Sequence, residues 1–307
     1  MNQNNVYEMV TDTICKMLEQ GFIPWQRPWS NNKTNMAWSR LTNKPYSFIN
    51  HLLLANPEKK YKTCEDVLND VSGEWLTFNQ IKELGGSVKK GEKARPVIFF
   101  KWLEKTTDRT DENGNEIIDK IPCLQRYFVF KTTQCEGIEQ KYNEDDGTTY
   151  DFRENKTAEE VANEYLTREN IEIRNDNLNK AFYHIEKDYI NMPKKEQFRN
   201  AEEYYSTLFH EITHSTGNEK RLDRLKNGIL SDGEENYSLE ELTAEIGSAS
   251  ILATLKIDTS KTLRNSAAYI QSWLKVLKND KKMIVFASAR AEKAIRYIFN
   301  FNTEVAV

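Results

Sequence analysis

Apolar residues in the first part of the chain recur at helical spacing in three stretches. Residues 5–21 carry an apolar residue at every third or fourth position and end at Gly21, which predicts an amphipathic helix. Residues 47–55 and 75–86 show the same spacing over shorter lengths, and the second stretch ends in a pair of glycines. We therefore predict three helices before residue 87.

Two strand-like runs follow at residues 95–103 and 124–133, and a basic turn precedes the first of them. The polar segment between the runs contains Asn113 and Gly114, a pair that favours the positive φ angles of a tight hairpin turn. We therefore predict an extended hairpin. With the helices it forms a small α+β domain, in which helices pack on an antiparallel sheet.

The second half of the chain begins with short strand patterns and continues with a longer helix pattern. Residues 180–193 predict two short strands joined by a turn at Asp188. Residues 197–217 predict a helix with one apolar side, which Gly217 ends at the C′ position. This helix carries two of the four histidines of the chain.

Helical patterns also fill the remainder of the chain. Residues 237–255 predict a helix that begins with Ser238 as its N-cap. Residues 264–298 predict two helices that pack through small residues. The second half is therefore expected to be mainly helical, within an α+β protein of two domains.

Composition differs between the halves and supports this division. Residues 1–104 carry 14 Lys+Arg against 11 Asp+Glu, residues 136–307 carry 24 against 31, and five of the six tryptophans precede residue 105. The polar, acidic segment 135–160 has no apolar periodicity and is interpreted as a linker. We place the two domains at residues 1–150 and 151–307.

The overall composition limits the class of protein. The chain has 38% hydrophobic residues and a mean hydropathy of −0.74, and no run of apolar residues long enough to cross a membrane. The N-terminal segment lacks the basic start and apolar core of a signal peptide. The four cysteines form no CxxC pair, which favours reduced thiols. We expect a cytoplasmic protein without a membrane partner.

Cations and aromatic residues alternate in the first half, a combination typical of single-stranded nucleic-acid binding. Cations can follow the phosphates, while rings stack under unpaired bases. The alternative is that rings beside prolines fill the core and that the lysine-rich turn is only solvated. The candidate DNA-binding residues are Trp25, Arg27, Trp29, Lys44, Tyr46, Lys89, Lys90, Lys93 and Arg95.

The segment LFHEITHSTG at 208–217 contains two of the four histidines of the chain. His210 and His214 are four residues apart and lie on one face of the predicted helix, so both imidazoles can bind one zinc ion. Glu211 lies beside them and can take a proton from a water molecule on the metal. The alternative is a helix with two histidines that make ordinary hydrogen bonds.

A catalytic zinc ion takes three protein ligands, and no histidine follows His214. The third ligand is therefore expected to be a carboxylate of the helix at 237–255. Glu245 occupies a position of the apolar stripe, where an unpartnered carboxylate would be costly. Glu241 lies one turn earlier and would also be the N3 residue of a capping box with Ser238. We favour Glu241 as ligand and Glu245 as support for a histidine, and the reverse assignment stays open.

Blocks in both halves resemble the ArdC-like antirestriction proteins of plasmids, phages and mobile elements. In the first half the resemblance rests on IPWQRPW, LTNKPYSFINHLLL, WLTFNQIKELGGSVKKGEKARPVIFFKW and FVFKTTQCEGI, and in the second on YYSTLFHEITHSTG, RLDR and YSLEELTAEIGSA. These blocks cover nearly the whole chain, and their order and spacing are more specific than HExxH alone. One departure is Asn43, which replaces the glycine of the usual TGK and also tolerates left-handed φ.

The resemblance implies an N-terminal domain that binds single-stranded DNA and a C-terminal zincin-like metallopeptidase domain. It also implies protection of incoming mobile-element or phage DNA from host restriction. His210, His214 and Glu241 would then hold Zn²⁺, or another divalent metal such as Mn²⁺, and Glu211 would act as general base on an unidentified protein substrate. The alternative is a DNA-binding shield with a structural or inactive metal centre and no proteolysis.

Overall fold

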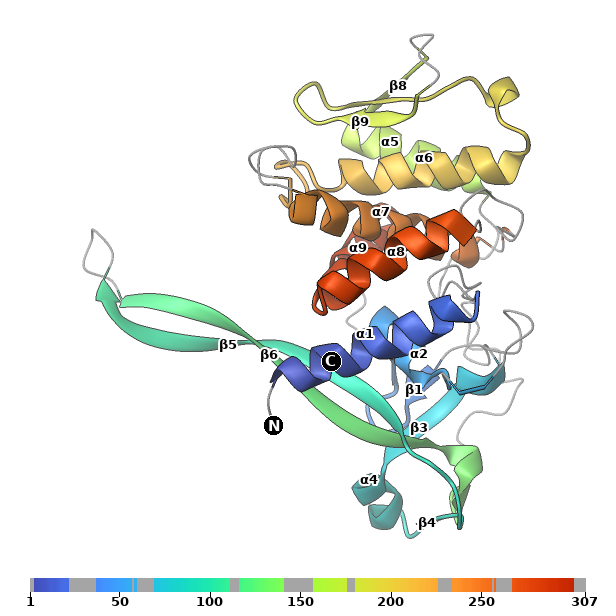
Figure 1. Cartoon of the computed structure of the whole chain (residues 1–307), viewed down its shortest axis with the longest axis vertical. Helices are drawn as coiled ribbons and strands as arrows, with labels where there is room; N and C mark the ends of the chain where they lie inside the picture. The colour runs from blue at the N-terminus through green and yellow to red at the C-terminus, as the bar shows by residue number, and fades with distance from the viewer. Residues whose placement is uncertain are drawn as a thin grey trace.

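A computed structural model describes most of the chain, and its helices and strands form a stack of layers (Figure 1). The sheet of the first half lies at one end of the stack, and the small sheet of the second half lies at the other. The described residues are 3–21, 37–56, 58–59, 69–110, 116–140, 157–175, 180–225, 234–255, 257 and 267–300, with the side chains of 3–5, 100–110, 116–123, 234–237 and 267–270 left aside.

Five strands form the sheet of the first half, in the order β2-β1-β3-β6-β5. β5 and β6 pair antiparallel with Arg95 opposite Val129, and the far half of this hairpin projects beyond the body (Figure 1). The predicted hairpin is confirmed, and its turn lies outside the described residues. The strands are β1 (Ala37–Ser39), β2 (Lys44–Pro45), β3 (Gly73–Thr77), β5 (Arg95–Thr110) and β6 (Glu116–Lys131).

Among the described residues, three helices and a short two-stranded sheet complete the first half. The prediction of a helix over 75–86 is wrong at its start, because residues up to Thr77 belong to β3 and Thr77 caps the helix by accepting a hydrogen bond from Gln80 N. Asn43 has a φ of 56°, as expected for the residue that replaces glycine. The elements are α1 (Gln3–Glu19), α2 (Phe48–Leu54), α4 (Phe78–Glu83), β4 (Ser87–Val88), a 3-10 turn (Thr132–Gln134) and β7 (Cys135–Glu136).

The predicted linker at 135–160 is wrong at both ends. Cys135 and Glu136 form β7, which pairs antiparallel with β4. At the other end, Thr157 caps α5 (Ala158–Glu169), and Asn170 ends that helix in a left-handed conformation with a φ of 55°. The residues from 141 to 156 lie outside the described part of the chain.

The second half combines a three-stranded sheet with four further helices. In this sheet β10 lies in the centre, parallel to β8 and antiparallel to β9. The predicted turn at Asp188 is confirmed, with a φ of 52°. The elements are β8 (Glu172–Arg174), β9 (Phe182–His184), β10 (Tyr189–Asn191), a 3-10 turn (Lys195–Gln197), α6 (Ala201–Ser215), α7 (Glu234–Thr254), α8 (Ala267–Asn279) and α9 (Met283–Phe299).

The start of α7 differs from the prediction. The helix begins at Glu234, so Ser238 lies inside it and is not the N-cap. The capping-box role considered for Glu241 therefore does not apply. The apolar stripe is as predicted, because Leu242 and Leu252 are fully or almost fully buried. The two helices predicted for 264–298 are confirmed as α8 and α9.

A single hydrophobic cluster joins the two halves. Ile14 of α1 and Leu52 of α2 belong to the same buried cluster as Leu242 of α7, Leu277 of α8 and Ile284 of α9. In Figure 1, α1 and α2 accordingly lie against the α8–α9 layer. Burial of these side chains stabilises both halves, because apolar burial contributes roughly 1.5–3 kcal/mol for each large aliphatic side chain. The halves therefore share part of their core.

Two further sequence-based expectations concern thiols and membranes. Cys15 and Cys135 are buried free thiols, and burial raises the pKa of each. The side chains of the other two cysteines lie outside the described part of the chain. Among the described helices, none is long and apolar enough to cross a membrane.

Candidate metal centre

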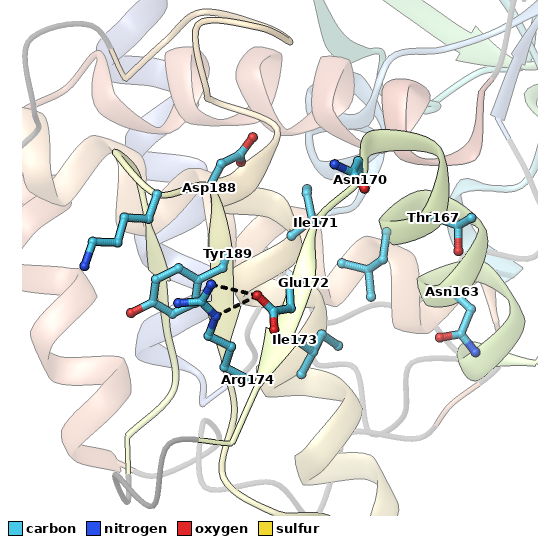
Figure 2. Close-up of a pocket in the computed structure, with 11 residues that line it drawn as sticks. Asn163, Thr167, Asn170, Ile171, Glu172, Ile173, Arg174, Asp188 and Tyr189 are labelled. Atoms are coloured by element: carbon cyan, nitrogen blue, oxygen red, sulfur yellow. Dashed lines mark hydrogen bonds and ion pairs between the residues drawn. The ribbon is translucent and has the colours of Figure 1, made fainter.

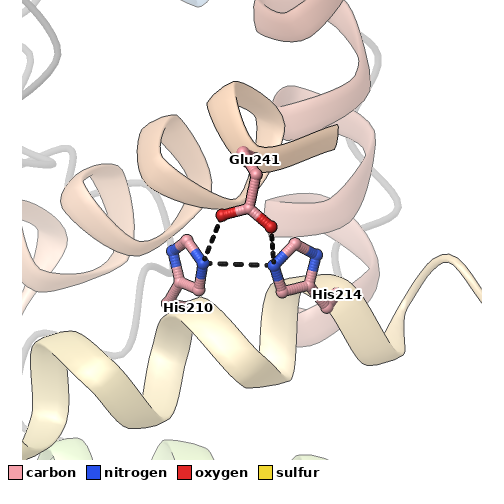
Figure 3. A group of neighbouring side chains, drawn as sticks. All are labelled: His210, His214 and Glu241. Atoms are coloured by element: carbon pink, nitrogen blue, oxygen red, sulfur yellow. Dashed lines mark hydrogen bonds and ion pairs between the residues drawn. The ribbon is translucent and has the colours of Figure 1, made fainter. Parts of the chain in front are cut away.

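The two histidines of the HExxH segment face α7 from consecutive turns of α6. Asn200 caps this helix by accepting a hydrogen bond from Glu203 N at 2.8 Å. The imidazole rings of His210 and His214 are 4.7 Å apart between centroids and almost perpendicular, at 86°. Their Nε2 atoms are 3.1 Å apart (Figure 3). Both side chains are largely buried, so the space between them is shielded from bulk water.

Glu241 of α7 lies across this pair (Figure 3). Its Oε2 is 3.4 Å from His210 Nε2, and its Oε1 is 3.5 Å from His214 Nε2. Ligand atoms around a tetrahedral zinc ion, with bonds of about 2.0–2.1 Å, lie roughly 3.3–3.4 Å from one another. The three side chains therefore fit a single divalent ion.

Two more carboxylates face the outer nitrogens of the histidines. Glu240 Oε1 is 3.1 Å from His214 Nδ1, and Glu245 Oε1 is 3.5 Å from His210 Nδ1. The second distance is too long for a good hydrogen bond, and His210 Nδ1 is buried without a hydrogen bond to any described residue. A carboxylate at Nδ1 directs the ring so that Nε2 is free to bind a metal.

The same contacts set the charges of the metal-free centre. Burial works against the charged form of His214, but its hydrogen bonds to Glu240 and Glu241 raise its pKa to about 10. Burial also opposes the charge on Glu241, yet the hydrogen bonds from His210 and His214 hold its pKa below the ordinary value. Because a metal-bound imidazole must be neutral at the ligating nitrogen, metal binding at His214 would compete with a proton.

The two arginines of the RLDR block hold the surroundings of the centre. Arg224 donates from Nε to Glu240 Oε2 at 2.9 Å and from Nη1 to Thr216 Oγ1 at 2.6 Å. Despite burial, the charge of Arg224 holds the pKa of Glu240 below its ordinary value. Arg221 donates to Ser215 O at 2.7 Å and pairs with Asp188 in the β9–β10 turn.

Sequence reasoning missed Glu240 and Arg224 as contributors to the centre. Both residues belong to blocks that carry the family resemblance, which was the available signal. Their contacts depend on how the chain returns after α6, and helical periodicity does not reveal that. The resemblance thus contained information that the spacing of the residues did not.

A glycine sets the distance between α6 and α7. A Cβ atom at Gly247 would lie 2.6 Å from Thr213 Cγ2 and 2.8 Å from Thr213 Oγ1, closer than real contacts allow. Near the same crossing, Ser248 donates to Ser206 O at 2.7 Å. This close approach allows the Glu241 carboxylate to reach both imidazoles.

Gly217 ends α6 for a different reason from the one expected. It does not adopt a left-handed φ, but a Cβ atom there would lie 2.6 Å from Leu225 Cγ. Glycine at this position therefore makes room for the returning chain, which carries Arg221 and Arg224.

Glu211 is buried beside the histidines, with 7% of its surface exposed. Its side chain makes no hydrogen bond or ion pair with any residue in the described part of the chain. Its carboxylate oxygens are not among the buried atoms that lack a partner, so the carboxylate keeps contact with solvent although most of the residue is buried. The charge of Glu211 also contributes to the raised pKa of His214.

A separate groove lies where α5 borders the small sheet of the second half (Figure 2). It has a volume of about 630 Å³ and is lined by α5, β8 and the β9–β10 turn. Arg174 pairs with Glu172 at 2.7 Å and lies 4.1 Å from the ring centroid of Tyr189. His210 and His214 are not part of its lining, so the groove is distinct from the candidate metal centre.

The candidate DNA-binding lysines lie in the turn between β4 and β5. Lys89, Lys90 and Lys93 are exposed, and Gly91 between them has a φ of 92°. Lys89 Nζ donates to Thr133 O at 2.8 Å, which holds the turn against the end of β6. The three cations are therefore available to a ligand at one end of the first sheet.

The other candidate DNA-binding residues are placed differently. The Arg95 guanidinium forms an ion pair with Asp70 at 2.6 Å and lies over the Trp75 ring. Tyr46 is 6% exposed, and burial raises its pKa to about 12 despite a hydrogen bond with Ser39. Its ring packs in the core and is not presented to solvent. Lys44 is half-buried on β2, and Trp25, Arg27 and Trp29 lie outside the described residues.

Comparison with known proteins gives two family matches and three curated relatives, one of which is matched over most of its length. Residues 4–130 match the N-terminal domain of anti-restriction factor ArdC, and residues 160–290 match a zincin-like metallopeptidase family. The protein y4eC of Sinorhizobium fredii is 30% identical over 302 residues, covering 94% of this chain and 90% of that protein. Two DNA primases TraC of Escherichia coli are 30% and 32% identical over 96% of this chain, which spans only 20% and 27% of their length.

Two crystal structures of the antirestriction protein ArdC from the R388 plasmid are similar over almost their whole length. The metal-free structure is 34% identical, with a TM-score of 0.62, and covers 97% of this chain and 100% of its own. The Mn(II)-bound structure is 33% identical, with a TM-score of 0.64, and covers 95% of this chain and 96% of its own. By its two family matches and its full-length structural similarity, this chain belongs to the ArdC family of antirestriction proteins.

Proposed function

We propose that this protein protects incoming DNA from restriction by binding single-stranded DNA through its N-terminal half and hydrolysing a protein through a zinc centre in its C-terminal half. The observation that carries the hydrolytic part is the grouping of His210, His214 and Glu241 next to Glu211. A purely structural metal site has no use for a carboxylate that can act as a base beside its ligands.

In the proposed mechanism each side chain has one task. A bound divalent ion would polarise a peptide carbonyl and make water more acidic. His210, His214 and Glu241 would hold that ion, with Glu240 and Glu245 fixing the rings of the two histidines. Glu211 would accept a proton from the attacking water and deliver it to the leaving amide nitrogen.

The substrate would bind as an extended peptide. β9 is an edge strand of its sheet and packs against α6, and its residues are half-exposed. An edge strand can pair with an added strand through main-chain hydrogen bonds, whatever the peptide sequence. The proposal therefore assigns peptide positioning to Phe182–His184.

The identity of the metal is tested by elemental analysis of the purified protein. We expect about one zinc ion per chain, because two imidazoles and one carboxylate are a common zinc ligand set, with Mn²⁺ as the alternative. The double change His210→Ala/His214→Ala should remove it. Glu241→Gln should lower the occupancy far more than Glu245→Gln, and the opposite order would exchange the roles of the two glutamates. Full occupancy in the histidine double variant would refute the site.

The DNA-binding part is tested on the full-length protein. We expect tighter binding to single-stranded than to duplex DNA, with an affinity that falls as salt rises. Changing Lys89, Lys90 and Lys93 to glutamine should weaken binding and reduce the salt slope by roughly 0.7 for each lost phosphate contact. Equal affinity for duplex DNA would contradict the single-strand preference.

The alternative function is a DNA-binding shield in which hydrolysis has no part. The exposed lysine turn favours it, because coating DNA requires cations and no catalytic base. Glu211→Gln separates the two functions, since it removes the proposed base but none of the proposed ligands. We expect peptide cleavage to fall at least a hundredfold, with metal content and DNA affinity unchanged. Protection of DNA in cells then decides: its loss supports the protease, and its survival supports the shield.

A further inference from the structure

Two exposed phenylalanines lie at the end of β3, each with a cation over its ring. Phe78, the first residue of α4, is 47% exposed, and Lys82 Nζ is 4.8 Å from its ring centroid. Phe128 on β6 is 48% exposed, and the Arg126 guanidinium is 5.0 Å from its ring centroid. Isolated apolar side chains on a surface need no explanation, but neighbouring ones mark a binding site.

Both phenylalanines lie next to the last residue pair of the β3–β6 ladder. Thr77 is paired with Val129 in the antiparallel β3–β6 ladder. The ladder ends there: Phe78 follows Thr77 as the first residue of α4, and Phe128 is the neighbour of Val129 on β6. Arg126 and Phe128 lie two residues apart on β6 and so share one face of the sheet. Each ring with its cation therefore lies at the same end of this sheet, where α4 and β6 are in contact.

The surroundings of this patch are cationic. Residues 78–95 carry five Lys or Arg residues against two Glu residues. The exposed turn of Lys89, Lys90 and Lys93 follows β4, and β4 packs against α4 at the same end of the molecule (Figure 1). Negative phosphates and unpaired bases together match a surface of this composition, because cations attract the backbone and rings stack on the bases.

We propose that Phe78 and Phe128 form a base-stacking platform for single-stranded DNA. Lys82 and Arg126 would lie beside the phosphates of the stacked nucleotides, and the lysine turn would extend the path of the strand. This inference rests on the DNA binding proposed above and specifies where the bases bind. Neither ring was among the sequence-based candidates, whose one described aromatic residue, Tyr46, lies in the core.

The platform is tested by fluorescence anisotropy with the full-length protein and a labelled single-stranded oligonucleotide of about 20 nucleotides. Phe78→Ala and Phe128→Ala should each lower the affinity about tenfold. The slope of log affinity against log salt should stay unchanged, since neither ring contacts a phosphate. Lys82→Gln should instead reduce that slope. Phe128→Trp should retain the affinity and add tryptophan quenching on DNA binding.

Tyr127→Ala is the matched control. Tyr127 is the next residue on the same strand, is 42% exposed and points to the opposite face, where it packs against Phe99. It should bind DNA like the wild type, and thermal unfolding should show that all variants are folded. A tenfold loss in Tyr127→Ala would overturn the assignment of the bases to the Phe78–Phe128 face.

The remaining outcomes distinguish this inference from the proposed function. If the wild type binds single-stranded DNA and Phe78→Ala/Phe128→Ala binds it equally well, the platform is wrong and DNA binding stands. If the wild type does not bind, the proposed DNA binding itself fails, and the platform with it. If the double change abolishes self-association and leaves DNA affinity intact, the patch is a contact between copies and the platform is overturned.

Discussion

His214 Nδ1 lies 3.1 Å from Glu240 Oε1, and Arg224 donates to both oxygens of the same carboxylate, at 2.9 and 3.0 Å. Glu240 is 2% exposed, so this carboxylate is held from two sides in a buried place. The contact fixes the plane of the His214 ring and directs its Nε2 toward His210 and Glu241. The orientation of one candidate ligand therefore depends on an arginine outside both α6 and α7.

We predict that Glu240→Gln weakens metal binding by about 10–100-fold, because His214 loses a charged hydrogen-bond acceptor. Competition with a chromogenic chelator at pH 8 measures this change. Glu172→Gln is the control, since that side chain is 63% exposed on β8 and lies in the separate groove. Unchanged metal affinity in a folded Glu240→Gln variant would show that Glu240 does not orient the ligand.

Gly247→Ala should destabilise the protein and loosen the metal centre. The added methyl group overlaps Thr213, so α7 must move away from α6, at a cost of about 1–3 kcal/mol in the free energy of unfolding. Metal affinity should fall with it, because Glu241 moves with α7. Urea unfolding and the chelator competition measure both effects.

A double change checks this explanation of Gly247. Thr213→Ala removes the two atoms nearest to the new methyl group and leaves Thr213 Cβ at 3.2 Å, so Thr213→Ala/Gly247→Ala should lose less stability than the sum of the two single changes. Additive losses would mean that the overlap with Thr213 is not the cause.

The Asp188–Arg221 ion pair should give a defined dependence of stability on pH. Burial opposes the charge on Asp188, but hydrogen bonds from Arg221 and Tyr183 hold its pKa below the ordinary 3.8. The pair therefore contributes fully above that value, and its contribution is lost as the pH falls through the lowered pKa. Asp188→Asn should cost about 3 kcal/mol at pH 7, since it leaves the Arg221 charge buried.

Chemical unfolding of wild type and Asp188→Asn between pH 2 and pH 8 measures this contribution. The difference between their free energies of unfolding should be constant above about pH 5 and shrink toward pH 2. A difference that does not vary with pH would assign the loss to packing instead of charge.

The shared core predicts that the two halves unfold together. Because α1 and α2 pack in the same cluster as α7, α8 and α9, neither half can lose its structure without exposing the other. Calorimetry should show one transition, with equal calorimetric and van't Hoff enthalpies. Ile14→Ala should lower the stability of the whole chain by about 2–5 kcal/mol. Two separate transitions would contradict this prediction.

Sequence reasoning predicted the elements that local spacing defines. α1, α2, the β5–β6 hairpin and the pair of helices at the end of the chain follow from apolar periodicity and turn residues, and the structure contains them. Residues 75–77 were assigned to a helix because their strand partner, β6, begins about forty residues later in the chain. The Ser238 hydroxyl suits an N-cap, which is why the sequence predicts a helix start there. The structure places the start of α7 one turn earlier, at Glu234.

Some residues of the candidate metal centre can likewise be predicted from local spacing, and others cannot. The helical spacing of His210 and His214 is local and readable from the sequence. Elimination indicated a carboxylate as third ligand, and the preference for Glu241 over Glu245 stays a prediction. Glu240 and Gly247 act through the packing of α6 on α7, which no single segment encodes. The domain boundary near residue 150 stays a prediction. The sequence does not reveal the common core, because the apolar periodicity of each half can be explained without the other half.

The cluster that joins the two halves constrains how their sequences can evolve. Ile14 and Leu277 are far apart in the gene but border one packed volume, so an enlarged side chain at one position is tolerated only if the other shrinks. Across related sequences, these positions should therefore change in concert. An exchange of N-terminal halves between two relatives would separate side chains that were selected together, and such hybrids should fold poorly even if each parent folds well.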